Sequence, residues 1–257
     1  MCLIAFAWHA HPRWRLLLAG NRDEFHARPS AALARWDGTP IIAGRDLQAG
    51  GTWLGVTAGG RCCVVTNVRD PHDPQQGASR GLLATDYLAG EAAAAAHARH
   101  LLAHASGYRP FNLLTFDAHD AFYLGNRPEP RMQAVNHGVH GLSNADFDTP
   151  WPKTRLLMDR MRAWIDGGDP GSFAPLFAAL ADEQVASEAD LPDTGIGLER
   201  ERWLSSAFIR GADYGTRAST VVAIDHGGGG VISERRFGPN GCFLGQTTLR
   251  FADAPGS

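Results

Sequence analysis

Cys2 follows Met1, and this position gives one residue two groups that can act together in catalysis. A small second residue allows Met1 to be trimmed, which would leave a cysteine with both a thiol and a free α-amine. Their unperturbed pKa values are about 8.5 and about 7.7–8.0, so the amine is suited to take the thiol proton near neutral pH. This is the arrangement of N-terminal-nucleophile catalysis. The alternative is an apolar residue that opens a buried strand, because free cysteines are among the most buried residues.

A second candidate is the polar run Asn21-Arg22-Asp23-Glu24. Beside a thiol, the guanidinium of Arg22 would lower the thiol pKa, and a carboxylate would orient the terminal amine. Three consecutive charged residues at the end of an apolar strand are also typical of a solvated turn. The functional interpretation therefore requires that this run lies close to Cys2.

Two later segments contain residue types that bind or stabilise anions. Asn144, in Gly141-Leu142-Ser143-Asn144, offers an amide donor for a developing oxyanion. Arg217, in Tyr214-Gly215-Thr216-Arg217, offers a guanidinium for a substrate carboxylate or phosphate. The structural alternatives are a turn before a capped helix for the first segment, and a strand-opening turn with a surface arginine for the second.

The apolar runs at 2–8 and 14–20 predict two strands joined by a loop at 9–13. Both runs are almost continuously apolar, which indicates burial on both faces. An antiparallel pair places the start of its first strand beside the end of its second strand. We therefore expect Cys2 to lie near the Asn21-Arg22-Asp23-Glu24 run.

The remaining patterns predict a hairpin-rich fold. Strands are expected at 50–56, 61–68, 112–116 and 121–125, and at 220–225 and 231–237, which form a final hairpin. Residues 41–46 form a short edge strand or a loop segment. Helices are expected at 79–88, 91–103, 151–166 and 172–180. Because hairpins outnumber βαβ units, we predict an α+β fold with antiparallel sheets and helices packed on their faces. No repeat or low-complexity linker divides the chain, so a single domain over residues 1–257 is expected.

The composition excludes a general affinity for polyanions. Hydrophobic residues make up 44% and charged residues 20% of the chain, with a net charge of −3. This balance favours neither nucleic acid nor an anionic membrane surface. No apolar run reaches the ~18–20 residues that span a bilayer, and no leader segment is recognisable. We therefore expect a cytoplasmic protein without a transmembrane segment.

The potential metal-binding residues do not form a convincing site. The four cysteines lack zinc-type spacing, so free, reduced thiols are expected. His100 and His104 are four residues apart on a predicted helix, but no carboxylate or cysteine accompanies them, which favours a solvated helix face over a metal site. Among the basic residues, Lys153 is the only lysine, which sets that position apart.

Five segments in order along the chain resemble the NRDE family, the family of the transport-and-Golgi-organisation protein 2. They run from residue 1 to about residue 237, so the resemblance covers nearly the whole chain. The segments are Met1-Cys2, Asn21-Arg22-Asp23-Glu24 with Arg28-Pro29, Gly51-Thr52-Trp53-Leu54-Gly55, Gly141-Leu142-Ser143-Asn144 with Thr149-Pro150-Trp151, and Tyr214-Gly215-Thr216-Arg217.

The resemblance implies a four-layer αββα sandwich of the N-terminal-nucleophile hydrolase type, which cysteine acylases such as bile-salt and penicillin V hydrolases share. By likeness to those enzymes, Cys2 would be the nucleophile, Arg22 would flank the thiol and Asp23 would meet the amine. Asn144 would serve the oxyanion, and Arg217 would close the site. Substrate contacts are expected from Asn21, Glu24, Trp53 and Thr216.

One departure from the acylases leaves the carboxylate role open. In those enzymes two residues separate the arginine from the aspartate, whereas Arg22 and Asp23 are adjacent here. Neighbours on an extended chain point in opposite directions. Either Asp23 or Glu24 therefore fills the role, or neither residue does.

The family implies two alternative functions. The first is a hydrolase of a linear amide or thioester that needs no cofactor. The second is a non-catalytic carrier of haem or acyl-CoA, since family members are associated with haem trafficking and lipid handling. For transient haem binding, the candidate iron ligands are Cys2, His9, His11 and His26.

Overall fold

Two antiparallel sheets stacked face to face form the centre of the structure, a computed structural model that describes residues 2–71, 73, 77–167 and 169–251. Sheet A has the strand order β10-β1-β2-β11-β12-β13, and sheet B the order β3-β4-β5-β6-β7-β8-β9. Sheet A consists of β1 (Cys2–Trp8), β2 (Trp14–Phe25), β10 (Gly138–Leu142), β11 (Tyr214–Asp225), β12 (Gly230–Phe237) and β13 (Phe243–Phe251). Sheet B consists of β3 (Ser30–Arg35), β4 (Ile41–Asp46), β5 (Leu54–Thr57), β6 (Cys62–Asn67), β7 (Phe111–Phe116), β8 (Ala121–Gly125) and β9 (Arg131–Ala134).

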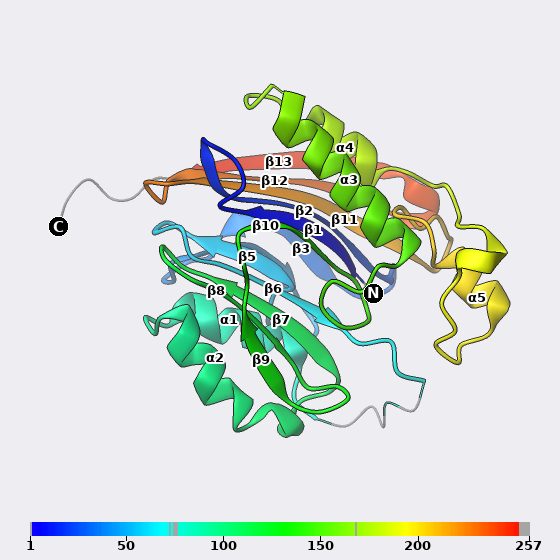
Figure 1. The fold of residues 1–257 in the computed structure, drawn as a ribbon, viewed down its shortest axis with the longest axis horizontal. Helices are drawn as coiled ribbons and strands as arrows, with labels where there is room; N and C mark the ends of the chain where they lie inside the picture. Colours follow the sequence, from blue (N-terminus) through cyan, green and yellow to red (C-terminus); the bar gives the residue numbers. More distant parts are fainter. Residues whose placement is uncertain (1, 72, 74–76, 168, 252–257) are drawn as a thin grey trace.

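Helices cover the outer faces of both sheets (Figure 1). On sheet A lie α3 (Pro152–Gly167) and α4 (Ala174–Leu180), and on sheet B lie α1 (Arg80–Ala89) and α2 (Ala94–Leu102). The short α5 (Leu198–Trp203) lies at the end of the sandwich beside the N-terminus. The order helix, sheet, sheet, helix confirms the predicted four-layer αββα sandwich.

The alternation of side chains along β1 explains why its sequence is apolar throughout. Ile4, Phe6 and Trp8 face the other sheet and join the core between the two sheets. Leu3, Ala5 and Ala7 point the opposite way and join the core beneath α3 and α4. A strand in the middle of a four-layer sandwich buries both faces, and so it needs no polar alternation.

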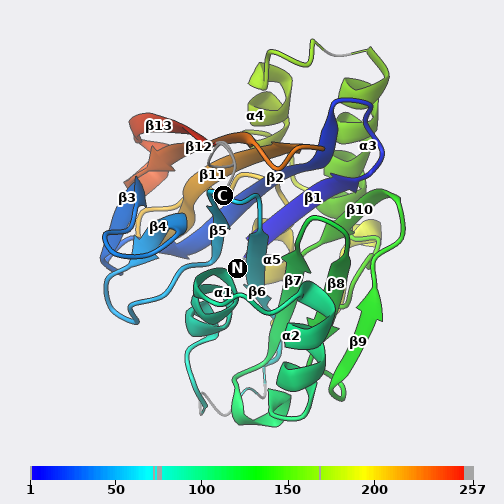
Figure 2. The ribbon, with the colours of Figure 1, turned by 90° about the vertical axis from the view of Figure 1, so that its left-hand side faces the viewer.

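The strand β2 is longer than the sequence analysis predicted. It continues beyond Gly20 through Phe25, so Asn21-Arg22-Asp23-Glu24 is part of a strand rather than a turn after one. The extension is held by β11, which pairs with β2 from Tyr214↔Phe25 onwards. Figure 2 shows the two strands side by side in the middle of sheet A.

The strands β3, β9, β10 and β13, most of whose residues are exposed or half-buried, were not expected. The prediction that the hairpin of residues 220–225 and 231–237 is the final one is wrong, because β13 follows and forms an edge of sheet A. β13 alternates between exposed and half-buried positions, a weak signal typical of an edge. The second helix also begins later than expected, at Ala94, whose amide donates to the Asp117 carboxylate at 2.7 Å.

Candidate functional site

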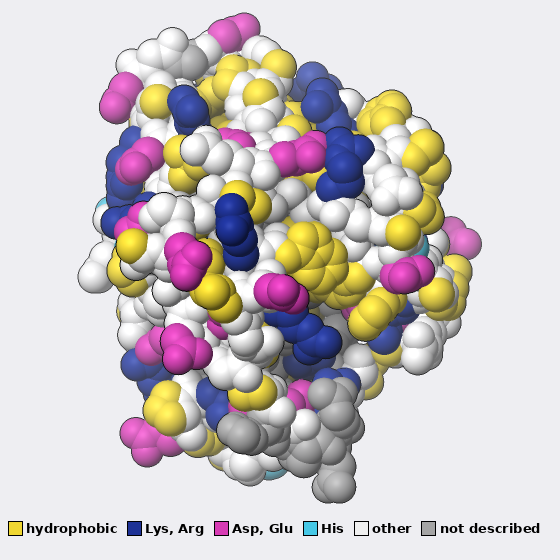
Figure 3. All heavy atoms as spheres, turned by 90° about the vertical axis from the view of Figure 1, so that its right-hand side faces the viewer, with side chains coloured by type: hydrophobic (Ala, Val, Ile, Leu, Met, Phe, Trp, Pro, Cys, Tyr) yellow, Lys and Arg dark blue, Asp and Glu magenta, His cyan; other side chains and the backbone are white. Residues whose placement is uncertain are grey.

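A cavity of about 460 Å³ lies between the two sheets, at the end of the sandwich where β1 begins. Cys2 and Arg22 from sheet A, Asn67 from sheet B, and Trp53, which immediately precedes β5, contribute to its wall. Figure 3 views the molecule from the side of the N-terminus and shows basic side chains inside a hollow on that face.

The strand register brings Cys2 beside Arg22, as the hairpin prediction required. Cys2 pairs directly with Arg22 across β1 and β2, and directly paired residues project from the same face of a sheet. Both side chains therefore point to the inner face, where the cavity lies. The Cys2 residue is only 6% exposed, and this burial raises the pKa of its thiol, although Arg22 acts in the opposite direction. Met1 lies outside the described residues.

Asp23 and Glu24 lie on opposite faces of β2. Asp23 is buried on the helix-covered side, where its Oδ1 accepts a 2.7 Å hydrogen bond from Oγ1 of Thr216. Burial raises the pKa of the Asp23 carboxyl, while Lys153, Thr216 and Arg22 lower it. Of the two candidate carboxylates, Asp23 is thus the one that has another buried charged group near it.

That second charge belongs to Lys153, in the first turn of α3. Its side chain is buried, and Nζ donates a 2.8 Å hydrogen bond to the carbonyl oxygen of Leu204. Burial lowers the pKa of Lys153 to about 8, although Asp23 acts to raise it. The only lysine of the chain therefore stands behind the strands that carry Cys2 and Arg22.

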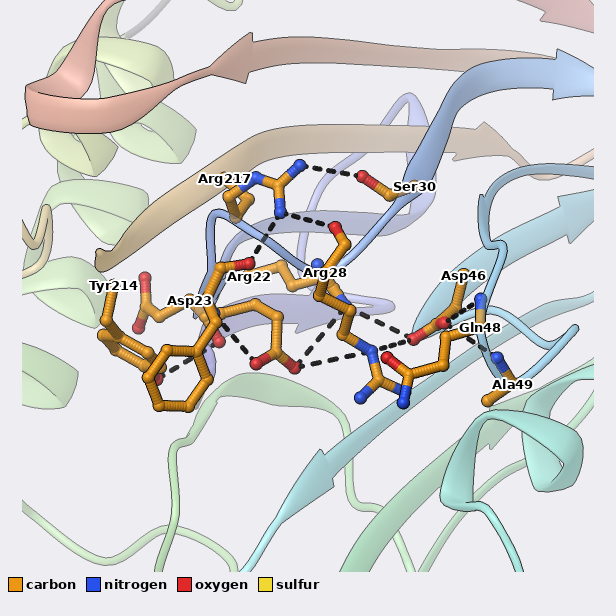
Figure 4. Close-up of polar contacts among 11 residues, drawn as sticks. Arg22, Asp23, Arg28, Ser30, Asp46, Gln48, Ala49, Tyr214 and Arg217 are labelled. Carbon is orange, nitrogen blue, oxygen red and sulfur yellow. Dashed lines mark hydrogen bonds and ion pairs between the residues drawn. The ribbon is translucent and has the colours of Figure 1, made fainter. Parts of the chain in front are cut away.

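Glu24, in contrast, belongs to an ion-pair network on the cavity side (Figure 4). The Arg22 guanidinium lies 3.6 Å from Glu24 and 3.5 Å from Asp46. Arg28 donates to the same Asp46 oxygen at 2.7 Å. Asp46 has a lowered pKa: burial acts to raise it, but the hydrogen bonds from Arg28, Ala49 and Gln48 outweigh this effect. The network fixes the Arg22 side chain on the cavity wall.

Arg217 reaches the cavity because of a β-bulge. The β2–β11 register runs from Asp23↔Thr216 to Arg22↔Ala218, so Arg217 is the extra residue. A bulge redirects a side chain that would otherwise alternate. The guanidinium donates to the carbonyl oxygens of Phe25 and Arg28 at 2.8 and 2.9 Å, and to the Ser30 hydroxyl at 3.1 Å. Figure 4 shows Arg217 bridging this turn of chain.

Asn144 lies close to Cys2 but contributes no atoms to the cavity wall among the described residues. The Ser143 hydroxyl donates to the Cys2 carbonyl oxygen at 2.9 Å, which ties this segment to β1. The Asn144 amide donates to the backbone and side-chain oxygens of Asn67, at 2.9 and 3.0 Å. It is therefore occupied in orienting Asn67.

Asn67 is a candidate that the sequence analysis missed. It ends β6 and lines the same cavity as Cys2. Because its Oδ1 accepts from Asn144, its own NH₂ group is the part of the side chain left to donate. No sequence signal marked this residue, since an asparagine at the end of a strand is typical of an ordinary turn.

The predicted substrate-contacting residues divide into two groups. Trp53 and Glu24 line the cavity. Asn21 and Thr216 are absent from the described lining, and their side chains lie on the helix-covered face of sheet A. The Asn21 amide donates to the carbonyl oxygens of Leu180 and Ala207, both at 2.8 Å. Asn21 therefore joins α4 to sheet A, and Thr216 orients Asp23.

The candidate iron ligands do not converge on one place. His9 and His11 follow the end of β1, and Cys2 begins it, so a strand of seven residues, about 20 Å long, separates them. His26 contributes no atoms to the cavity wall among the described residues. A site that combines Cys2 with His9 or His11 is thus incompatible with the fold.

The described residues include no helix that is long and apolar enough to cross a membrane. The fold itself is similar to those of an acid amidase and a bile acid hydrolase. A Caenorhabditis elegans orthologue of N-acylethanolamine-hydrolysing acid amidase superposes with a TM-score of 0.50 at 10% identity, over 88% of this chain and 93% of that chain. A mutant of the conjugated bile acid hydrolase from Clostridium perfringens superposes with a TM-score of 0.54 at 8% identity, over 97% and 92%.

The sequence comparisons identify the family. The human Transport and Golgi organization protein 2 homolog is 33% identical over 258 residues, which cover 91% of this chain and 92% of that protein. The mouse homolog is 30% identical over 255 residues, with the same coverage. The family model for Transport and Golgi organisation 2 matches residues 1–239. The chain, with Cys2 and Arg22 paired at the start of its sandwich, therefore belongs to the Transport and Golgi organisation 2 family.

Proposed function

We propose that this protein is a Cys2-dependent hydrolase that cleaves a linear amide or thioester. The observation that carries the proposal is the pairing of Cys2 with Arg22 at the wall of a 460 Å³ cavity. The two solved structures named above come from enzymes that hydrolyse N-acylethanolamines and conjugated bile acids. Their names support an acyl substrate with a carbonyl that a thiol can attack.

The proposed reaction begins once removal of Met1 frees the α-amine of Cys2. The amine takes the thiol proton, and Sγ attacks the acyl carbon to form a tetrahedral intermediate. The Asn67 NH₂ group donates to the oxyanion, with Asn144 holding Asn67 in place. When the intermediate collapses, the C–N or C–S bond breaks and the protonated amine passes its proton to the leaving group. Water then hydrolyses the acyl–Cys2 thioester and restores the thiol.

The buried charges suit this proton transfer. Burial raises the pKa of the Cys2 thiol, so the thiol needs a base in direct contact to become a nucleophile. A freed amine on the same residue is that base. Asp23, with Lys153 near it, would stabilise the protonated amine in the intermediate. Trp53 would form an apolar part of the substrate site.

The experiment compares wild type with Cys2→Ala on a panel of acyl thioesters and 4-nitrophenyl esters. We expect turnover by wild type and none by Cys2→Ala. Cys242→Ala is the matched control, because Cys242 is a free thiol that is exposed, and its loss should leave turnover unchanged. Equal turnover by wild type and Cys2→Ala would refute the hydrolase.

A second candidate is a carrier of haem or acyl-CoA in the cytoplasm, where the free thiols of the chain would stay reduced. One observation favours it: several arginines line the cavity, where they could pair with haem propionates or with phosphates. Haem would then take Cys2 as its iron ligand, without His9 or His11. A haem titration that shifts the Soret band in wild type but not in Cys2→Ala would support the carrier, and an unchanged spectrum would refute haem binding.

A further inference from the structure

The wall of the cavity is basic, although the chain as a whole is acidic. The described lining residues include seven arginines, namely Arg22, Arg28, Arg45, Arg80, Arg109, Arg217 and Arg236, and four acidic residues, namely Asp23, Glu24, Asp46 and Glu234. The formal balance is therefore +3, against −3 for the whole chain. Of the four acidic residues, Asp23 directs its carboxylate to the opposite face of β2, toward Thr216. A cleft lined by one sign of charge raises the local concentration of ligands of the opposite sign.

Six of these arginines already have partners. Arg22 and Arg28 donate to Asp46, and Arg109 donates to Asp73. Arg45, Arg80 and Arg217 donate to backbone carbonyl oxygens. These contacts hold the six side chains in place on the wall, and three of them pair an arginine with a carboxylate.

Arg236 is different. Among the described residues, its guanidinium has no hydrogen-bond or ion-pair partner, and its Nε is buried without an acceptor. Glu234, two residues away on the same strand face, acts on Arg236 as a charge but forms no described ion pair with it, and its Oε1 accepts from the Leu33 amide at 2.9 Å. A buried donor without a partner is costly, so a ligand that supplies an acceptor would gain from binding there.

The sheet register places Arg236 in line with the nucleophile. Cys2 pairs with Arg22, Arg22 with Ala218, and Ala218 with Arg236. All four side chains therefore lie in one row on the cavity face, and three strand spacings of about 4.8 Å separate the ends by about 14 Å.

The neighbours of Arg236 in this row are small. Ala218 lies on one side and Gly245 on the other. A Cβ atom on Gly245 would lie 3.4 Å from an Arg236 guanidinium nitrogen, so the glycine leaves that nitrogen uncovered. The apolar side chains of Phe237 and Leu244 line the cavity nearby. The arrangement suits a ligand whose hydrocarbon chain is apolar along its length and ends in an acidic group.

We infer that Arg236 binds an oxyanion, a carboxylate or a phosphate, at the far end of the acyl chain whose carbonyl reaches Cys2. This inference rests on the proposed function for the position of the carbonyl. The substrate is thus an acyl compound that carries an acidic group at the end distant from its scissile carbonyl. The distance between these two groups should match the row of about 14 Å from Cys2 to Arg236.

The test measures binding in a Cys2→Ala background, so that it does not depend on turnover. The probes are monoamides of α,ω-dicarboxylic acids, from about four to about twelve carbons long to bracket the about 14 Å row. Each probe is compared by calorimetry with its neutral ω-methyl ester, and with a probe of the same length that ends in a phosphate. The acidic probe that binds more tightly shows whether the site prefers a carboxylate or a phosphate.

We expect the best acidic probe to bind about 10- to 100-fold more tightly than its neutral ester, as a charge-assisted hydrogen bond provides. Arg236→Met should abolish this preference, and Arg236→Lys should retain part of it. Arg250→Met is the matched control, since Arg250 is an exposed arginine on the edge strand of the same sheet and lies outside the cavity lining. The melting temperature of each variant shows whether it has folded.

Equal binding of the acidic and neutral probes, or an unchanged preference in a folded Arg236→Met variant, would overturn the inference. Turnover of the corresponding thioesters by the protein with Cys2 intact is measured separately. If the preference for acidic probes holds and no thioester is hydrolysed, the hydrolase is refuted while the oxyanion site stands, and the acidic compound is then a bound ligand.

Discussion

Replacing Lys153 with methionine should change how the stability of the protein depends on pH. Burial lowers the pKa of this lysine from 10.5 to about 8. Between these values the unfolded chain binds a proton that the folded chain does not, so the free energy of unfolding rises with pH across this window. At about 1.4 kcal/mol for each pH unit, the full window corresponds to about 3 kcal/mol.

The measurement is urea unfolding of wild type and Lys153→Met at intervals between about pH 8 and about pH 10.5. Buried cysteines and tyrosines also titrate in alkaline solution, but they are common to both proteins and cancel in the difference. We expect wild type to gain about 3 kcal/mol relative to Lys153→Met as the pH rises. Lys153→Arg is the matched control, because arginine stays charged and its difference from Lys153→Met should be constant. If the free energies of unfolding of wild type and Lys153→Met change in parallel with pH, the claim that Lys153 has a lowered pKa is refuted.

Three further predictions concern the cavity wall and the chain next to it. Gly51→Ala should lower the free energy of unfolding by about 1–3 kcal/mol, because its Cβ would lie 2.4 Å from the Gly81 carbonyl carbon. Gly107→Ala, whose Cβ has no atom within 4 Å, should change it by less than about 0.5 kcal/mol in the same urea titration. Asn67→Asp keeps the acceptor but loses the amide donor, so the kcat of the proposed reaction should fall about 100- to 1000-fold, and an unchanged kcat would exclude Asn67 as the oxyanion donor. Arg217→Met removes the hydrogen bonds that hold the turn at residues 25–30, so limited proteolysis of this variant should cut first within that turn. A variant that resists cleavage there as well as wild type does would contradict this role.

The sequence predicted the part of the fold that is strongly apolar. Continuous apolar runs such as Cys2–Trp8 identify strands buried on both faces, and the hairpin they form places Cys2 beside Arg22. The edge strand Phe243–Phe251 escaped prediction because only one side of it packs, which leaves a mixed and partly exposed pattern. Edge strands carry a weak periodic signal for this reason.

The sequence indicated most of the residue types in the site, but it did not indicate how their side chains are arranged. Once Asp23 is known to lie in a strand, the period of two places it on the face opposite Arg22 and Glu24, and only the packing of α3 brings Lys153 to it. The position of Arg217 depends on a bulge that no local pattern marks. The role of Asn67 depends on a partner 77 residues away in the chain, Asn144, and pairings of such separation cannot be read from local sequence.

The measurement that tests the central claim most directly is the intact mass of the purified protein before and after incubation with an activated acyl thioester, followed by peptide mapping. A Cys242→Ser background removes the exposed thiol as a competing site, while Cys62 and Cys63 are buried. If Cys2 is an N-terminal nucleophile, the protein will lack Met1 and gain one acyl group on Cys2. Retention of Met1 with no acyl group on Cys2 would contradict the account.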